Sequence, residues 1–165
     1  MKVLTAIWAD PAMSRATIFK ARMLSERGIP VDPLYRTPNS QLNVVNDVDF
    51  VGRSRMLPVG GRCTGWRDRM DYAKFVTKAN TLAWREKADA VIGCNTLGTV
   101  AAFSVNLINS KSGLIYHNFC FDVSTKGVGS LGRLVRWVEL IAARRSEITI
   151  FPAQEVPLNT RQWHP

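Results

Sequence analysis

Short apolar runs and longer helical stripes follow one another along this chain. Apolar runs that are too short for helices predict strands at residues 2–8, 90–94, 113–116 and 148–151. Apolar residues spaced by three and four predict helices from about Ser14 to Gly28, over 66–86, from Leu97 to Ile108 and from Ser130 to Arg145. The alternation of the two patterns favours an α/β protein.

Residues 88–122 read as strand, crossover helix, strand. A crossover of that length joins parallel strands, because a hairpin turn cannot supply it. Neither strand alternates apolar with polar residues, as expected where helices cover both faces of a sheet. We therefore predict a Rossmann-like three-layer α/β/α fold with a mostly parallel sheet.

A further strand is predicted at Ile29–Tyr35, where Pro30 and Pro33 favour an edge position or a short element. Residues 36–64 are hard to interpret, with a strand pair or one interrupted strand at 48–51 and 56–59. We expect one domain over 1–156 and a loose tail at 157–165.

Two predicted helices carry well-defined apolar stripes. The stripe after Ser130 consists of Leu131, Leu134, Val135, Val138, Ile141 and Ala142, with Trp137 and Glu139 away from it. The stripe of the crossover helix consists of Leu97, Val100, Ala101, Ser104, Leu107 and Ile108. Both stripes are expected to face the core.

Ligands of open parallel sheets bind outside the carboxyl ends of the strands, and polar residues follow two such ends here. Asn95 and Thr96 follow one strand, where they can cap a helix or contact a ligand, and His117 with Asn118 ends the next. Cys94 and Cys120 are interpreted as buried fillers. Three more candidates lie on predicted loops or a helix start: Asp10, as helix cap or acceptor contact, and Lys126 and Arg133, as phosphate contacts or solvated side chains.

The chain is basic, with 22 Lys and Arg against 13 Asp and Glu and a formal charge of +9. Such a charge attracts phosphorylated ligands, an anionic membrane or nucleic acid, or only keeps a domain soluble. Nucleic acid is the weakest of these, because no recognition motif accompanies the charge. Trp66 and Trp137, next to basic residues, suggest either peripheral membrane contact or partial burial.

Several classes of site are not expected. Three cysteines and two histidines at unrelated spacings argue against a metal site and favour reduced thiols in a cytoplasmic protein. The first strand-to-helix turn has no Gly-x-Gly-x-x-Gly, and no Walker loop occurs, so we expect no nucleotide cofactor. No apolar run is long enough for a membrane span, and no signal peptide is visible.

Two stretches resemble the N-terminal domain of family-4 glycosyltransferases. The first is VIGCNTLGTVAAFSVNLINSKSGLIYHNFCFDV, at residues 91–123, and the second extends from Arg133 to Glu155. The resemblance implies a GT-B enzyme, in which two Rossmann-like domains flank the active site and no metal is needed. The N-terminal domain of such enzymes holds the sugar acceptor, and the C-terminal domain binds the nucleotide-sugar donor.

The chain departs from this family at three places. The turn Ala9–Ala12 lacks the family's glycine pair, Cys120 stands where an acidic residue is common, and Pro157 interrupts the helix expected after Glu155. The glutamate pair of the donor domain is also absent. The resemblance therefore implies an acceptor half alone, inactive by itself, as a fragment or as a half-enzyme with a donor-domain subunit or a homodimer. The alternative is a stand-alone protein that binds a phosphorylated or polyanionic ligand.

Overall fold

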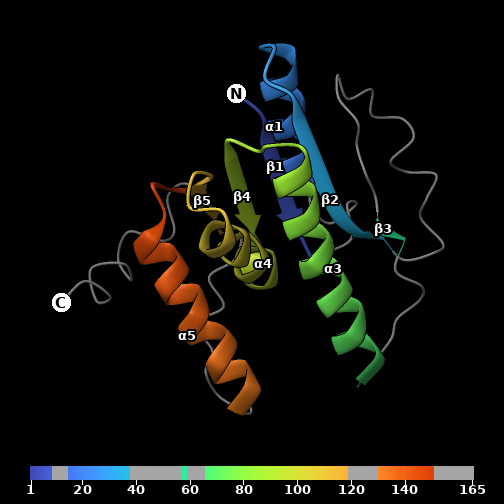
Figure 1. Ribbon diagram of the computed structural model, residues 1–165, viewed down its shortest axis with the longest axis vertical. Helices are drawn as coiled ribbons and strands as arrows, with labels where there is room; N and C mark the ends of the chain where they lie inside the picture. Colours follow the sequence, from blue (N-terminus) through green and yellow to red (C-terminus); the bar gives the residue numbers. More distant parts are fainter. Residues whose placement is uncertain (9–14, 38–56, 59–65, 119–129, 151–165) are drawn as a thin grey trace.

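The computed structural model describes residues 1–8, 15–37, 57–58, 66–118 and 130–150, which form a parallel sheet with helices on both faces (Figure 1). The strands are β1 (Val3–Ile7), β2 (Val31–Thr37), β3 (Leu57–Pro58), β4 (Ala90–Cys94), β5 (Gly113–His117) and β6 (Ile148–Ile150). The helices are α1 (Arg15–Glu26), α3 (Trp66–Arg85), α4 (Asn95–Ile108) and α5 (Ser130–Arg145). The α/β, Rossmann-like prediction is confirmed.

The strands lie in the order β3-β2-β1-β4-β5-β6, and every neighbouring pair is parallel. The chain moves outward from β1 to β3, returns to pair β4 with β1, and then moves outward in the opposite direction. The reversal lies between the carboxyl ends of β1 and β4, where Ile7 and Cys94 are partners in the register. In sheets of this type, that point is where ligands bind.

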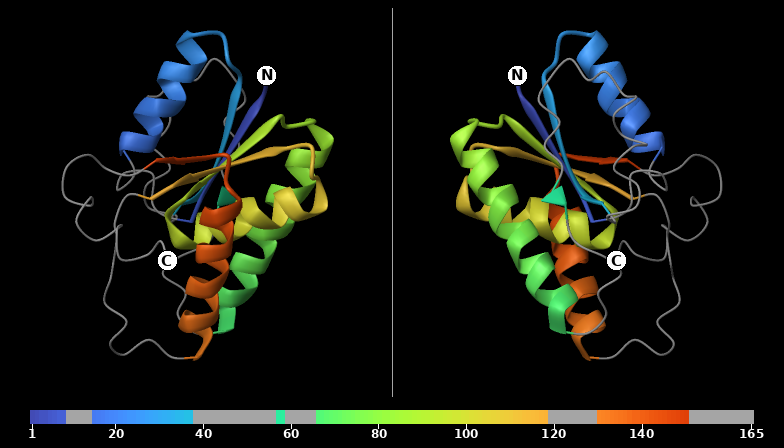
Figure 2. Two further views of the ribbon diagram at one scale, coloured as in Figure 1. Left: turned by 90° about the vertical axis from the view of Figure 1, so that its left-hand side faces the viewer. Right: turned by 90° about the vertical axis from the view of Figure 1, so that its right-hand side faces the viewer.

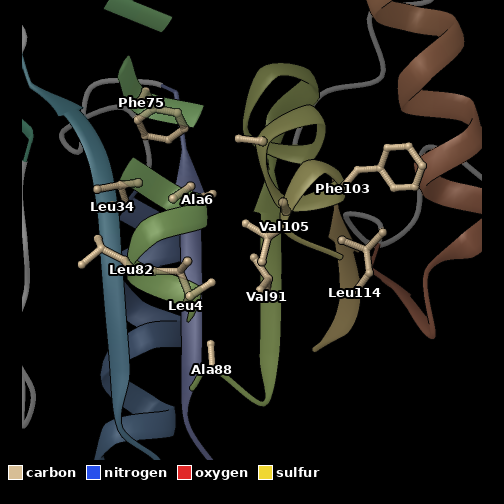
Figure 3. Packing of buried hydrophobic residues seen from close by; sticks show 14 of the residues in the cluster. Leu4, Ala6, Leu34, Phe75, Leu82, Ala88, Val91, Phe103, Val105 and Leu114 are labelled. Carbon is tan, nitrogen blue, oxygen red and sulfur yellow. The ribbon is translucent and has the colours of Figure 1, made fainter. Parts of the chain in front are cut away.

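The two faces of the sheet are covered unequally (Figure 2). Helix α1 lies on one face, and α3, α4 and α5 lie on the other. Successive strand residues point to opposite faces, so Leu4 and Ala6 of β1 face the three-helix layer. There they join the main core with Phe75 of α3, Val105 of α4 and other buried residues (Figure 3). The alternate strand residues, such as Val3 of β1, point to the other face of the sheet. There they pack against Ala21 and Leu24 of α1.

The proline argument for an edge strand at β2 was wrong. Strand β2 lies between β3 and β1, and Pro33 is buried opposite Thr5 of β1. The reason is that β3 pairs only with Arg36 and Thr37, at the far end of β2. A proline near the middle of β2 therefore interrupts no ladder between the described parts of β2 and β3.

Both predicted helix stripes need correction. In α5, Leu134 is 54% exposed, while Glu139 accepts a hydrogen bond from the hydroxyl of Tyr116 in the sheet. In α4, Leu107 and Ile108 are 57% and 72% exposed. The true buried face of α4 is made of small residues and two larger ones: Gly98, Thr99, Ala101, Ala102, Phe103 and Val105. Close approach of α4 to the sheet selects those small side chains over leucine.

The remaining boundaries agree with the sequence to within about two residues, as is usual for helix ends. The stretches at 48–51 and 157–165 lie outside the described residues. Of the strand proposed at 56–59, the structure describes Leu57–Pro58, which form β3.

Candidate functional site

Four residues form a line across the carboxyl edge of the sheet. The register places Tyr35 of β2 opposite Ile7 of β1, Ile7 opposite Cys94 of β4, and Cys94 opposite His117 of β5. Residues aligned in this way on parallel strands point to the same face, here the face covered by α1. We call this set, Tyr35, Ile7, Cys94 and His117, the carboxyl-edge row. It crosses the point where the strand order reverses.

Lys20 of α1 joins this row through His117. The Nζ atom of Lys20 lies 2.7 Å from Nε2 of His117, and Nδ1 of the same imidazole lies 3.7 Å from Sγ of Cys94. An ammonium group has donors only, so Nε2 of His117 accepts from Lys20. The imidazole then carries its own proton on Nδ1, which faces the sulfur of Cys94. Lys20, His117 and Cys94 thus form one connected polar group.

Burial decides the charge of this group. His117 is 3% exposed, and burial together with the nearby Lys20 ammonium lowers the pKa of His117 from 6.5 to about 4. Burial also lowers the pKa of Lys20, although the sulfur of Cys94 opposes that shift. His117 is therefore neutral at pH 7, with one imidazole nitrogen accepting and the other donating.

Tyr35 adds a buried hydroxyl to the same row. The residue is fully buried, and its hydroxyl has no hydrogen-bond partner within the described part of the chain. Burial, and then the sulfur of Cys94, raise the pKa of this hydroxyl, which keeps it protonated. A buried hydroxyl without a partner is costly, and a bound ligand group is one way to satisfy it.

Asn95 shapes the turn that brings α4 close to this edge. Its φ of 59° is left-handed, a conformation that asparagine tolerates better than most residues. Its Oδ1 accepts a hydrogen bond from the amide of Gly98 at 2.8 Å, so the predicted capping role is confirmed. Gly98 is required because a Cβ at this position would collide with the carbonyl oxygen of Ala6.

The side chain of Asn118 does not lie on the same face of the sheet as that of His117. It follows His117 directly, so the alternation of the strand directs it to the other face, where its side chain hydrogen-bonds Tyr116. The hydroxyl of Tyr116 donates to Glu139 of α5 at 2.9 Å. Asn118 thus contributes to the packing of α5 on the sheet.

Of the other predicted site residues, two lie on described helices and two lie outside the described residues. Thr96 is half-buried in the first turn of α4, and Arg133 is exposed on α5, which covers the face opposite α1. Asp10 and Lys126 lie outside the described residues. Neither Lys20 nor Tyr35 was predicted, and Cys94 was interpreted as filler. The available signal was that Cys94 and His117 end consecutive parallel strands.

Two other kinds of feature are absent from the part of the chain that the structure describes. No group of three or more His, Cys, Asp or Glu side chains there could hold a metal ion. Among the same residues, no helix has the length and apolar character needed to cross a membrane.

The fold has counterparts among solved structures. A UDP-N-acetylglucosamine 2-epimerase candidate from Listeria monocytogenes superimposes with a TM-score of 0.66 at 14% identity, over 99% of this chain and 42% of its own. The UDP-GlcNAc 2-epimerase of Methanocaldococcus jannaschii gives 0.62 at 16% identity, over 100% and 43%. MurG of Acinetobacter baumannii gives 0.53 at 14% identity, over 93% and 44%.

These likenesses show the fold, which is that of one domain of GT-B-type enzymes. The chain spans less than half the length of the three structures. They do not single out family 4 of the glycosyltransferases. No family model matches the chain, and no curated protein does.

Proposed function

We propose that this chain is one half of a GT-B-type enzyme that acts on a sugar nucleotide, and that the carboxyl-edge row with Lys20 contacts the ligand. The other half would come from a longer chain, a separate subunit or a second copy. The resemblance to family 4 supports assigning the acceptor side to this half, which would then have no turnover by itself. The fold likeness supports the enzyme type.

The contact between Lys20 and His117 carries the proposal. It joins a helix on one face of the sheet to a strand end beside the reversal point, where ligands bind in such sheets. An ammonium group at this edge can donate a charged hydrogen bond to an oxygen atom of an anionic ligand. The buried hydroxyl of Tyr35, in the same row, has a donor available for a ligand oxygen.

The arrangement also suggests a chemical role for His117. When Lys20 turns to a phosphate or carboxylate oxygen of the ligand, the Nε2 lone pair of His117 becomes available. That nitrogen can then accept the proton of a sugar hydroxyl, while Nδ1–H stays directed at Cys94. Neutralising the Lys20 charge also removes one cause of the low pKa of His117, which strengthens it as a base.

Binding of UDP-N-acetylglucosamine and of N-acetylglucosamine 1-phosphate to the full chain tests the proposal. We expect saturable shifts of the His117 imidazole signals in nuclear magnetic resonance spectra. Lys20→Met should weaken binding about tenfold or more, because a charged hydrogen bond is lost. Lys78→Met is the matched control, since Lys78 is exposed on α3, on the opposite face.

Two results would contradict the proposal. Equal affinity in the Lys20 and Lys78 variants would remove the site, and an absence of saturable shifts with both ligands would remove the sugar-nucleotide assignment. Robust transfer or hydrolysis by this chain alone would overturn the statement that it is half of an enzyme.

A second candidate is a stand-alone binding protein for a polyanion, which the charge of +9 favours. Its affinity for inorganic polyphosphate should fall steeply with added salt, because bound counterions are released and exposed charges are screened. Affinity that stays constant from low to high salt would exclude it. Sedimentation at high protein concentration separates the homodimer from a half that needs a different subunit.

A further inference from the structure

Helix α5 carries large apolar side chains on the side that faces away from the sheet. Leu134, Trp137 and Leu140 are 54%, 60% and 41% exposed. They follow one another at intervals of three residues, so they cover about one turn and a half of the same helix surface. The core side of α5 is supplied by Ala142, with Val138 packed against the core. The exposed three are therefore additional to the core.

Arginines lie at both ends of this exposed apolar surface. Arg133 is one turn before Trp137, and Arg144 is two turns after it. At 3.6 residues per turn, all three therefore lie on nearly the same side of the helix. Both are exposed, as is Arg145. The acidic residue of α5, Glu139, is engaged by Tyr116 on the sheet side. We call the surface formed by Arg133, Leu134, Trp137, Leu140 and Arg144 the outer face of α5.

We propose that the outer face of α5 binds the surface of an anionic lipid bilayer. Tryptophan and leucine enter the boundary between headgroups and acyl chains, and guanidinium groups at either end of the helix reach the lipid phosphates. A nucleic acid would use the arginines and leave the leucines in water. An anionic bilayer has a counterpart for both the apolar side chains and the guanidinium groups, and this match is the reason for proposing it.

The position of α5 is compatible with simultaneous ligand binding. Helix α5 lies in the layer opposite α1, as Figure 2 shows, so a bilayer on its outer face leaves the Lys20 side of the sheet uncovered. The inference does not depend on the proposed sugar-nucleotide function, because no residue of the outer face belongs to the carboxyl-edge row.

Co-sedimentation of the full chain with vesicles tests the inference. We expect binding to an equimolar mixture of phosphatidylcholine and phosphatidylglycerol, and little binding to phosphatidylcholine alone. Trp137→Ala should weaken the binding about tenfold, as expected for the loss of one buried aromatic side chain. Arg144→Gln should weaken it about fivefold, and high salt should weaken it further.

Trp84→Ala is the matched control, because Trp84 is 75% exposed on α3 and lies outside the outer face. Each variant should keep the far-ultraviolet circular dichroism spectrum of the parent, since the substituted side chains are exposed. Three results would overturn the inference: no binding to the mixed vesicles, an equal loss for the Trp84 and Trp137 variants, or a dimer that Trp137→Ala converts to monomer. The last would assign the outer face to a second copy.

Discussion

Cys94 and His117 are partners in the register at the ends of β4 and β5, with 3.7 Å between Sγ and Nδ1. The pairing places a buried thiol beside a buried imidazole at the edge where parallel sheets bind ligands. Lys20, on the other nitrogen of the ring, fixes which side of the imidazole donates. The protonation state of His117 is therefore the property that most directly reports on this site.

Acid should destabilise the protein through His117. The native pKa is about 4 and the ordinary value is 6.5, so between these values the unfolded chain binds a proton that the native chain excludes. The contribution of His117 to the free energy of unfolding is thus unchanged above pH 6.5 and decreases as the pH falls toward 4. Chemical denaturation of the parent and of His117→Gln across this range measures it.

The difference between the two proteins isolates His117 from the carboxyl groups that titrate in the same range. Equal pH dependence in both would contradict a buried, neutral His117. Lys20→Met should shift the imidazole titration toward 6.5 without restoring it fully, because burial is the larger cause of the low pKa.

Three substitutions at Asn95 should separate its two roles. Asn95→Gly keeps access to the left-handed φ and loses the hydrogen bond to the amide of Gly98, so it should cost only about 0.3 kcal/mol. Asn95→Ala loses both and should cost about 2–3 kcal/mol. Asn95→Asp keeps an acceptor oxygen at the start of α4 and should be nearly neutral. Thermal unfolding ranks the three, and a costlier Gly than Ala would refute this assignment.

Lys2 should stabilise the buried carboxylate of Asp32. Its Nζ lies 2.9 Å from Glu86 and 3.1 Å from Asp32, whose side chain is 10% exposed. Lys2→Met leaves this carboxylate without its partner and should cost about 2 kcal/mol, and adding Asp32→Asn should restore part of the loss. Lys74→Met, at a pair whose lysine is 73% exposed, should cost less than about 0.5 kcal/mol.

The ion pairs of Lys2 also predict how the stability of the protein changes at high pH. The hydrogen bond to Glu86 raises the pKa of Lys2 above 10.5, although burial acts in the other direction. The contribution of Lys2 is thus complete below pH 10.5 and is lost as the pH rises through the raised value. The stability difference between the parent and Lys2→Met should shrink over that range. A constant difference would show that Lys2 acts through packing alone.

Local patterns along the chain were sufficient to predict the helices and the two central strands that end at the candidate site. The apolar runs at 90–94 and 113–116 do not alternate with polar residues and are joined by a helix. Such a crossover requires parallel strands, whose ends therefore meet at one edge of the sheet. That reasoning brought the ends of β4 and β5, with Asn95 and His117, to the same edge, and the register confirms it. Asn95 was also correctly expected to cap the helix, because the cap depends on residues only three positions apart.

What the sequence by itself determined was the alternation of strands and helices, since apolar spacing depends on neighbours along the chain. Tertiary structure decided the site and the surface. The strand order brings Tyr35 and Cys94 to either side of Ile7, and α1 brings Lys20 to His117 over 97 residues of sequence. The tertiary structure also leaves Leu134, a member of the apolar stripe predicted for α5, exposed to solvent. Which side of a helix is buried depends on the close approach of other elements, and apolar spacing along one helix does not contain that information.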